Sequence, residues 1–409
     1  MKYASSKSFL PYARQHITQE DIDAVAEVLR SDWLTQGPTI AQFESALAEA
    51  ADARHVVACA TGTAALHLSM LALGTGPGDA VVTSPNTFVA DANCARYVGA
   101  DVTFADIDPD TGNMSLEALD RRLKDMTRYR MKVVIPVHFG GQPVDLPAVH
   151  ELASRHGAIV VDDACHALGT TYQSNGKELR IGCGAHSDMT IFSFHPVKHV
   201  ATGEGGAIAT PDEKLAERLR RFRTHGISKT NFVCNDLALA PDGQPNPWYY
   251  EMNELGFNYR LTDIQAALGI SQIRRLKESL QRRNDIASWY HELISENFPS
   301  GRVQPLGTDR RSKHAYHLFV VLLDFQAYGV TRATVMNRLR DAGIGTQVHY
   351  IPVPLQPYYR RVSGTGPGQF PGAEKYYSQA LSIPMYPQLT RTDCERVVAE
   401  LKQVLGEKA

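Results

Sequence analysis

The sequence has no long apolar run and almost no net charge. No stretch approaches the roughly 18 apolar residues that a membrane-spanning helix needs. Lys and Arg number 42 against 44 Asp and Glu, a net charge of −2, so the basic excess typical of nucleic-acid-binding proteins is missing. Residues 1–9 are polar and lack the apolar segment of a secretory signal. We therefore expect a cytoplasmic protein without nucleic-acid or membrane partners.

Cysteine is sparse and unpatterned. The six cysteines form no C-x-x-C pair and have no histidine at zinc-finger spacing, so we expect reduced thiols and no metal site. Disorder is excluded, because hydrophobic residues make up 43% of the chain. At about 150 residues per domain, the 409 residues allow two to three domains.

Short β-rich runs alternate with helical patterns between residues 55 and 225. This alternation predicts βαβ units and an α/β fold with a mainly parallel seven-stranded sheet, covered on both faces. The predicted strands are 55–59, 80–84, 101–107, 133–138, 158–163, 189–194 and 207–210. The predicted helices between them are 63–73, 88–99, 115–125 and 145–156, with another at 212–225.

The flanking segments complete the domain prediction. Thr18 precedes one helical pattern, and Thr39 with Gln42 is interpreted as a capping box that starts a second helix. Residues 227–255 show no periodicity, which for a loop of this length indicates a functional or interface segment. A long helical region at 262–295 leads to a smaller α+β part. We expect a large domain over 1–260 and a smaller one over 261–409.

Two groups of polar residues follow predicted strands, where an α/β sheet binds ligands. Gly62 and Thr63 open a helix whose free amides suit an anion such as phosphate, although Thr61 could simply be the cap of a core helix. Asp163 ends the strand 158–163 and His166 follows it. An acid at this position can bind a cation, or it can cap the next helix.

A lysine follows the strand 189–194, in the segment SFHPVKHVATGEGG. Lys198 lies between short strands, near Ser193 and a glycine run that we expect to be flexible. A lysine held in a cleft can act as a nucleophile, although an exposed turn lysine is the alternative. Together, an anion site, an acid and a lysine on one sheet edge are what pyridoxal 5′-phosphate (PLP) requires.

The sequence resembles the DegT-type PLP-dependent nucleotide-sugar aminotransferases, which have the aspartate-aminotransferase-like (type I) fold. The resemblance covers nearly the whole chain. It rests on LTQGP (34–38), ATGTAALH (60–67), SPNTFVADAN (84–93), VDDACHALG (161–169), FSFHPVKHVATGEGGA (192–207), LGFNYRLTDIQAALG (255–269) and GIGTQVHYIPVPLQPYY (343–359).

The resemblance implies a role for each matching residue. Lys198 would bond to the cofactor aldehyde and move protons, and Asp163 would pair with the ring nitrogen. The amides of Gly62 and Thr63 and the Ser193 hydroxyl would hold the phosphate. The remaining implied contacts are Phe88 on the ring face, His166 at the ring or its O3′ side, Asn258 at the phosphate of the neighbouring subunit, and Thr35, Gln36, His349 and Tyr350 in the sugar-nucleotide cleft.

The implied protein is a homodimer with shared active sites, in which loop 227–255 is interface and lid. The resemblance implies transfer of an amino group from L-glutamate to C4 of a UDP-linked 4-keto-6-deoxy-N-acetylhexosamine, as in pseudaminic acid biosynthesis. Alternatives are another nucleotide keto sugar (dTDP or GDP, C3 or C4), a PLP-dependent sugar dehydratase, and a catalytically silent binding relative. The presence of Lys198 favours transamination over dehydration.

Overall fold

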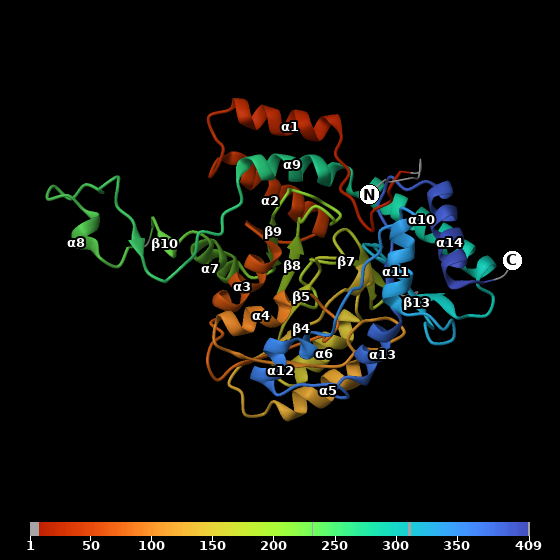
Figure 1. Ribbon diagram of the computed structural model, residues 1–409. Coiled ribbons are helices and arrows are strands. Elements are labelled where there is room, and N and C mark those ends of the chain that lie inside the picture. Colours follow the sequence, from red (N-terminus) through yellow and green to blue (C-terminus); the bar gives the residue numbers. More distant parts are fainter. Residues whose placement is uncertain (1–7, 231, 310–311, 408–409) are drawn as a thin grey trace.

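The computed structural model describes residues 8–230, 232–309 and 312–407. Its centre is a seven-stranded sheet with strand order β1-β9-β8-β5-β4-β2-β3 (Figure 1). Only β9 is antiparallel to its neighbours β1 and β8, and the remaining pairs are parallel. The strands are β1 (His55–Cys59), β2 (Ala80–Thr83), β3 (Asp101–Phe104), β4 (Lys132–Ile135), β5 (Ile159–Asp163), β8 (Met189–Ser193) and β9 (Gly206–Thr210).

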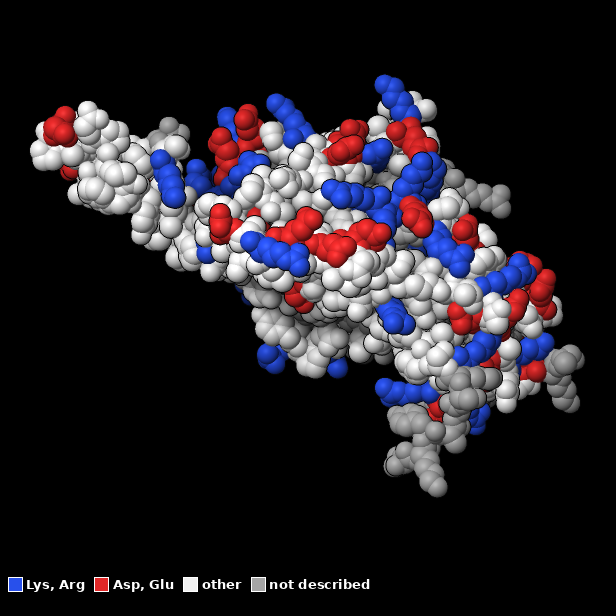
Figure 2. Space-filling model, turned by 90° about the horizontal axis from the view of Figure 1, so that it is seen from above, with Lys and Arg blue, Asp and Glu red and all other residues white. Residues whose placement is uncertain are grey.

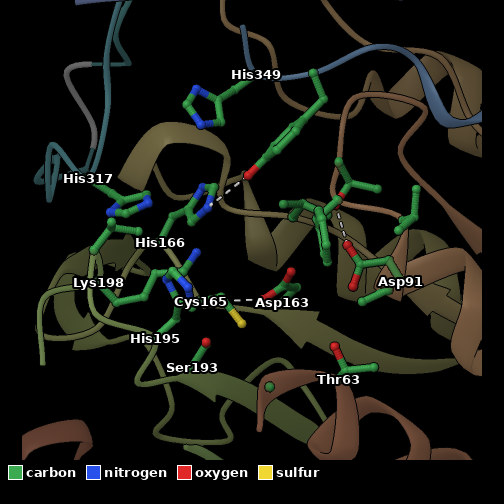
Figure 3. A pocket seen from close by; sticks show the side chains of 18 of the residues that line it. Thr63, Asp91, Asp163, Cys165, His166, Ser193, His195, Lys198, His317 and His349 are labelled. Atoms are coloured by element: carbon green, nitrogen blue, oxygen red, sulfur yellow. Dashed lines mark hydrogen bonds between the residues drawn. The ribbon is translucent and has the colours of Figure 1, made fainter. Parts of the chain in front are cut away.

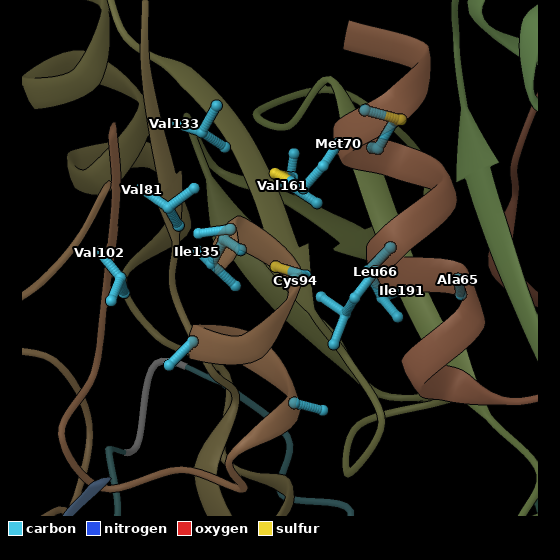
Figure 4. Packing of buried hydrophobic residues seen from close by; sticks show 14 of the residues in the cluster. Ala65, Leu66, Met70, Val81, Cys94, Val102, Val133, Ile135, Val161 and Ile191 are labelled. Atoms are coloured by element: carbon cyan, nitrogen blue, oxygen red, sulfur yellow. The ribbon is translucent and has the colours of Figure 1, made fainter. Parts of the chain in front are cut away.

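Helices cover both faces of this sheet. Alternate strand residues point to opposite faces: Val57 and Val81 pack in one hydrophobic cluster, Val56 and Val82 in the other. Figure 4 shows the first cluster, with Leu66 of α3 against the strand side chains. The helices on that face are α3 (Gly62–Leu73), α4 (Ala90–Tyr97) and α7 (Glu213–Arg223); those on the other face are α2 (Pro38–Ala51), α5 (Leu116–Asp125) and α6 (Leu146–Arg155).

The predicted mainly parallel sheet is confirmed, but the capping box at Thr39 is wrong. Helix α2 begins earlier, at Pro38 with Gly37 as its N-cap. The carboxylate of Asp263 accepts hydrogen bonds from the amides of Gly37 (2.8 Å) and Thr39 (3.0 Å). An acid more than 200 positions away therefore caps this helix, which no local pattern reveals. The prediction also missed a hairpin of β6 (Thr171–Ser174) and β7 (Lys177–Arg180).

The C-terminal part has its own antiparallel sheet and hydrophobic cluster. The chain turns at Arg275, between α9, which packs on α1 and α2, and α10, which packs on α14. The domain division at residue 260 stays a prediction. This part contains α10 (Leu276–Asn297), β12 (Val303–Pro305), β13 (Phe319–Leu323), α11 (Arg332–Asp341), α12 (Pro357–Ser363), α13 (Pro371–Gln379), β14 (Ala380–Ile383) and α14 (Arg391–Leu405), while α1 (Gln19–Arg30) and α9 (Asp263–Arg274) lie over the large sheet.

Residues 227–255, here called the arm, project away from the body of the molecule (Figure 1). Two short strands, β10 (Ile227–Ser228) and β11 (Glu251–Met252), pair at its base, and α8 (Asn235–Ala238) lies near its tip. Figure 2 shows few charged side chains on the arm. Among its described residues, Val233, Leu237, Trp248, Met252 and Leu255 are 61–78% exposed. Among the described residues, no helix is long and apolar enough to cross a membrane.

Candidate active site

A cavity of about 650 Å³ lies at the carboxyl ends of the parallel strands (Figure 3). Its walls come from the start of α3, the segment after β2, the ends of β5 and β8, and residues 347–351. This is the edge where the topology of an α/β sheet favours ligand binding. Of the predicted site residues, the cavity is lined by Gly62, Thr63, Phe88, Asp163, His166, Ser193, Lys198, His349 and Tyr350.

Lys198 is held by a loop that is closed at both ends. The amide of Lys198 donates to the carbonyl of His195 (2.9 Å), and the loop begins and ends where Phe194 pairs with Gly205 (2.9 Å). Burial lowers the pKa of the Lys198 ammonium, while the neighbouring acids oppose that shift. A lowered pKa favours the neutral amine that a nucleophile requires. Because Lys198 lines the cavity and is half-buried, the alternative of an exposed turn lysine is wrong.

Two carboxyl groups meet opposite the lysine. Asp163 ends β5 and its Oδ1 accepts the amide of Cys165 (2.8 Å). Asp91, from α4, is buried and receives the hydroxyl of Thr87. Burial and the charge of Asp163 raise the pKa of Asp91 well above its usual value, which favours the protonated form of Asp91. The Asp163 carboxyl group lines the cavity, where it can pair with a cationic ring nitrogen. The sequence prediction missed Asp91, although an acid among small helical residues was a possible signal.

The first turn of α3 approaches the end of β8 closely. A Cβ at Gly62 would lie 2.9 Å from Cβ of Ser193, and one at Gly206 would lie 2.3 Å from the carbonyl oxygen of Thr61. Thr61 caps the helix through the amide of Ala64 (3.0 Å), so the capping interpretation is confirmed. The amides of Gly62 and Thr63, which have no acceptor within the helix, sit at the cavity wall. Gly206 serves close packing, and the expectation of a flexible glycine run is wrong there.

Neutral imidazoles form the wall beside Lys198. The rings of His166 and His317 lie 4.2 Å apart between centroids, and Nε2 of His166 lies 3.4 Å from the hydroxyl of Tyr350. Burial lowers the pKa of His166 and His317 well below 6.5, and that of His349 to about 3. His317 was missed by sequence reasoning, because it precedes the apolar strand β13 and has no motif around it.

Asp162 lies behind the site, not in it. The amide of Val144 donates to Nδ1 of His138 (3.1 Å), so Nε2 of His138 carries the proton and donates to Asp162 (3.0 Å). Both side chains are fully buried. This pair fixes the end of β5 from which Asp163 projects.

Three predicted residues lie outside the cavity of the described chain. Thr35 and Gln36 are exposed, and Thr35 pairs with Thr262 at the start of α9. Asn258 is exposed and pairs with Thr224 beside the base of the arm. Phe88, in contrast, lines the cavity and is 58% exposed, so its ring is available to a ligand and does not belong to the core.

The residues present fit PLP. The helix amides and Ser193 suit its phosphate, Asp163 suits its ring nitrogen, and the amine of Lys198 suits its aldehyde. Nδ1 of His166 is buried without a hydrogen-bond partner among the described residues, and its ring lies at the cavity wall. We infer that the cavity can hold PLP between these groups.

Comparison with known proteins gives a consistent result. Residues 15–402 match the model of the DegT/DnrJ/EryC1/StrS aminotransferase family. The spore coat polysaccharide biosynthesis protein SpsC of Bacillus subtilis (strain 168) is 40% identical, over 97% of each chain. Helicobacter pylori PseC, an aminotransferase involved in pseudaminic acid biosynthesis, has a TM-score of 0.85 at 28% identity and covers 98% of this chain and 100% of its own. The sugar aminotransferase Spr1654 of Streptococcus pneumoniae, described as putative, has a PLP form with a TM-score of 0.83 at 26% identity, covering 98% and 99% of the two chains.

Proposed function

The chain belongs to the DegT/DnrJ/EryC1/StrS aminotransferase family, and on this premise we propose that it aminates C4 of a UDP-linked 4-keto-6-deoxy-N-acetylhexosamine with L-glutamate as donor. The family match and the related structures show the general activity: the chain is a PLP-dependent sugar aminotransferase of the type I fold. The observation that carries the proposal is the meeting of Lys198, Asp163 and the α3 amino terminus in one cavity.

Each residue has a defined task in this proposal. PLP, when bound, withdraws electrons from the carbon atom that gains or loses a proton. Asp163 would pair with the ring nitrogen and favour its protonated form, and burial favours the neutral form of the neighbouring Asp91. The Nζ of Lys198 moves the proton to and from the reacting carbon. The amides of Gly62 and Thr63, together with Ser193, orient the cofactor through its phosphate.

The sugar-nucleotide side of the proposal rests on residues 347–351 and on the relatives. His349 is fixed by Ser382 (Nδ1 to Oγ, 2.8 Å), and Tyr350 faces His166 across the cavity. Burial keeps His349 and Tyr350 neutral at physiological pH, since it lowers the pKa of His349 and raises that of Tyr350. Neutral donors can recognise the hydroxyl and acetamido groups of a sugar. PseC and SpsC are both described as proteins of sugar biosynthesis, which supports this substrate class.

The test is a substrate panel. The PLP-loaded enzyme is incubated with glutamate and with UDP-, dTDP- and GDP-linked 4-keto and 3-keto sugars, and products are identified by mass and by the configuration at the new amine. We expect amination of the UDP-linked 4-keto-6-deoxy-N-acetylhexosamine and formation of 2-oxoglutarate. Amination only of a dTDP or GDP sugar would contradict the substrate proposal. Release of ammonia together with a deoxygenated keto sugar, in place of an amino sugar, would establish a dehydratase instead.

We also propose that the active enzyme is a homodimer in which Asn258 reaches the phosphate group in the neighbouring subunit. The exposed apolar side chains of the arm support an interface, because apolar surface of this extent is typical of interaction sites. Asn258 lies beside the base of the arm and outside the cavity of its own chain. Thr35 and Gln36 stay candidates for the same shared cleft.

Mixed dimers test this proposal. Lys198→Ala and Asn258→Ala subunits are each inactive in the proposal, and they are unfolded together and refolded as a mixture. If Asn258 acts across the interface, one site of each mixed dimer is intact, so about a quarter of the wild-type activity returns. If Asn258 acts within its own chain, every site carries a lesion and no activity returns.

A further inference from the structure

The backbone of residues 314–318 passes behind the cavity and is held on several sides. The amides of Ala315 and Leu318 donate to the carbonyls of Gly141 (2.8 Å) and Gly140 (3.2 Å). Nε2 of His199 donates to the carbonyl of Ala315 (3.0 Å). Tyr316 has a φ of +45°, in the left-handed region that residues with a Cβ rarely adopt. Strain of this kind persists only where the surroundings enforce it, and it is often associated with function.

Two side chains of α10 also hold this segment: Nδ2 of Asn284 donates to the carbonyl of His314 (3.2 Å), and Arg283 makes further contacts. Its Nη1 donates to the carbonyls of Tyr316 (3.0 Å), His317 (3.4 Å) and Met385 (3.3 Å). The side chain is 2% exposed, and no carboxylate of the described residues pairs with it. Its Nε has no hydrogen-bond partner among those residues.

Burying a charged arginine without a partner carboxylate is unfavourable in free energy. Burial lowers the pKa of Arg283 to about 10, so the guanidinium is still charged at neutral pH. Apolar side chains that replace buried charges often stabilise a protein, so stability alone gives little reason for a charge here. Arg283 differs from other buried arginines because its contacts position an active-site side chain.

The contacts of Arg283 position the side chain of His317. Arg283 binds the backbone carbonyl of His317, and the His317 ring packs 4.2 Å from the His166 ring at an interplanar angle of 36°. On its other side the ring of His199 lies 5.6 Å away. Figure 3 shows His317 beside His166, above the lysine side chain. A shift of the strap 314–318 would therefore move a wall of the cavity.

We propose that Arg283 is a positioning residue of the active site, which fixes residues 315–317 so that His317 stays against His166 beside Lys198. Only the activity measurements that test this inference rest on the proposed function. Arg283 lines a second small cavity behind Lys198 and does not line the main one. It therefore acts through His317 and not on the substrate.

The charge of Arg283 has a second effect that can be measured. His317 is faced by His166, Lys198, His199 and Arg283. Burial contributes most to the low pKa of His317, and the positive charge of Arg283 lowers it further. Removing that charge is expected to raise the pKa of His317, while burial, the largest cause, still lowers it. The acid limb of the pH–rate profile then moves upward.

Arg282 provides a matched control on the same helix. It also binds backbone carbonyls, those of Pro387 (3.1 Å) and Leu389 (2.6 Å), and its guanidinium lies 4.8 Å from the centre of the Trp289 ring. Its contacts do not include residues 314–318. Arg282→Met thus removes a similar set of bonds without releasing the strap.

The experiment compares Arg283→Met, Arg283→Lys and Arg282→Met, each also combined with His317→Ala. We expect kcat to fall about 10- to 100-fold in Arg283→Met, as for a misplaced active-site group, with its acid limb shifted upward, and to change less than about threefold in Arg282→Met. In the His317→Ala background Arg283→Met should add little, because the effect passes through His317. Additive losses, or equal losses in both Met variants, would overturn the proposal.

A crystal structure of cofactor-free Arg283→Met gives a readout that is independent of activity. We expect the His317 ring to leave its position against His166, and an unmoved ring would refute the positioning role. If Arg283→Met does not fold, Arg283→Lys replaces it in both measurements, because the lysine side chain is one bond shorter and its nitrogen ends before the position from which Nη1 reaches the three carbonyls. Failure of the wild type to aminate any sugar would refute the proposed function while leaving this structural test intact.

Discussion

Replacing Gly62 with alanine tests the phosphate site at its tightest point. The added Cβ would lie 2.9 Å from Cβ and 3.2 Å from Oγ of Ser193, so the start of α3 and the end of β8 must separate by several tenths of an ångström. Overpacking of this kind costs about 1–3 kcal/mol. Because both segments are proposed to hold the phosphate, the loss should appear in the affinity for PLP, as a Kd raised about 5- to 150-fold.

The assay compares PLP with pyridoxal, which lacks the phosphate group. Both are titrated into cofactor-free protein and followed by absorbance. We expect Gly62→Ala to weaken PLP binding strongly and pyridoxal binding by less than about threefold, because the ring contacts of Asp163 are untouched. Gly366→Ala is the control, since a Cβ there meets nothing within 4 Å. Equal weakening of PLP and pyridoxal would show that the phosphate is not bound at this turn.

Three other predictions concern single groups of the site. Lys198→Ala should lower kcat by about 10²- to 10⁴-fold or more, and borohydride should no longer attach cofactor to the chain, as measured by intact mass; attachment to another lysine would contradict the assignment. Asp163→Asn should slow the half-reaction with glutamate by about 10- to 150-fold, the equivalent of a hydrogen bond to a charged group, in stopped-flow absorbance; an unchanged rate would exclude the pairing with the ring nitrogen. His199 is neutral in the folded protein because burial lowers its pKa, and it protonates near 6.5 when unfolded. Its contribution to stability is therefore complete above pH 6.5 and is lost on acidification, by about 1.4 kcal/mol per pH unit. Because the unfolded histidine is only half protonated at pH 6.5, His199→Gln should reduce the change in unfolding free energy between pH 6.5 and 5.5 by about 1 kcal/mol in denaturant titrations, and an unchanged value would show that His199 is already protonated.

Strands and helices with clear local patterns were predictable, and their ends were not. β1 has the predicted bounds, His55–Cys59. The strands predicted at 101–107 and 133–138 end sooner, at Phe104 and Ile135, because residues beyond them have other tertiary partners. The carboxylate of Asp106 accepts the amides of Gly372 (2.8 Å) and Ala373 (2.9 Å) at the start of α13.

The missed hairpin differs from these cases, because its signal was present in the sequence. Asn175 and Gly176 connect β6 and β7 with φ angles of +50° and +73°. Asn-Gly between two short runs is typical of a two-residue hairpin turn. The omission was one of interpretation.

The candidate site was predictable where a residue opens a helix, ends a strand or lies in the loop that follows a strand. Gly62, Asp163 and Lys198 all satisfy that rule, and they line one cavity. Asp91 and His317 reach the same cavity from a helix and from a long-range strap, so their positions depend on tertiary packing. The proposed roles of Thr35, Gln36 and Asn258 require a second chain and stay predictions.

The reversed strand β9 has a consequence for how this enzyme could be altered. Because β8 and β9 are antiparallel neighbours, the loop that carries Lys198 leaves the sheet and returns to it at adjacent positions, where Ser193 pairs with Gly206. The sheet therefore fixes the distance between the two ends of this loop, and insertions or deletions elsewhere in the chain do not change that distance. The exposed residues of the segment between them could be exchanged, provided that Lys198, His199 and Gly206 are kept, so protein engineers could vary this loop while leaving the scaffold untouched.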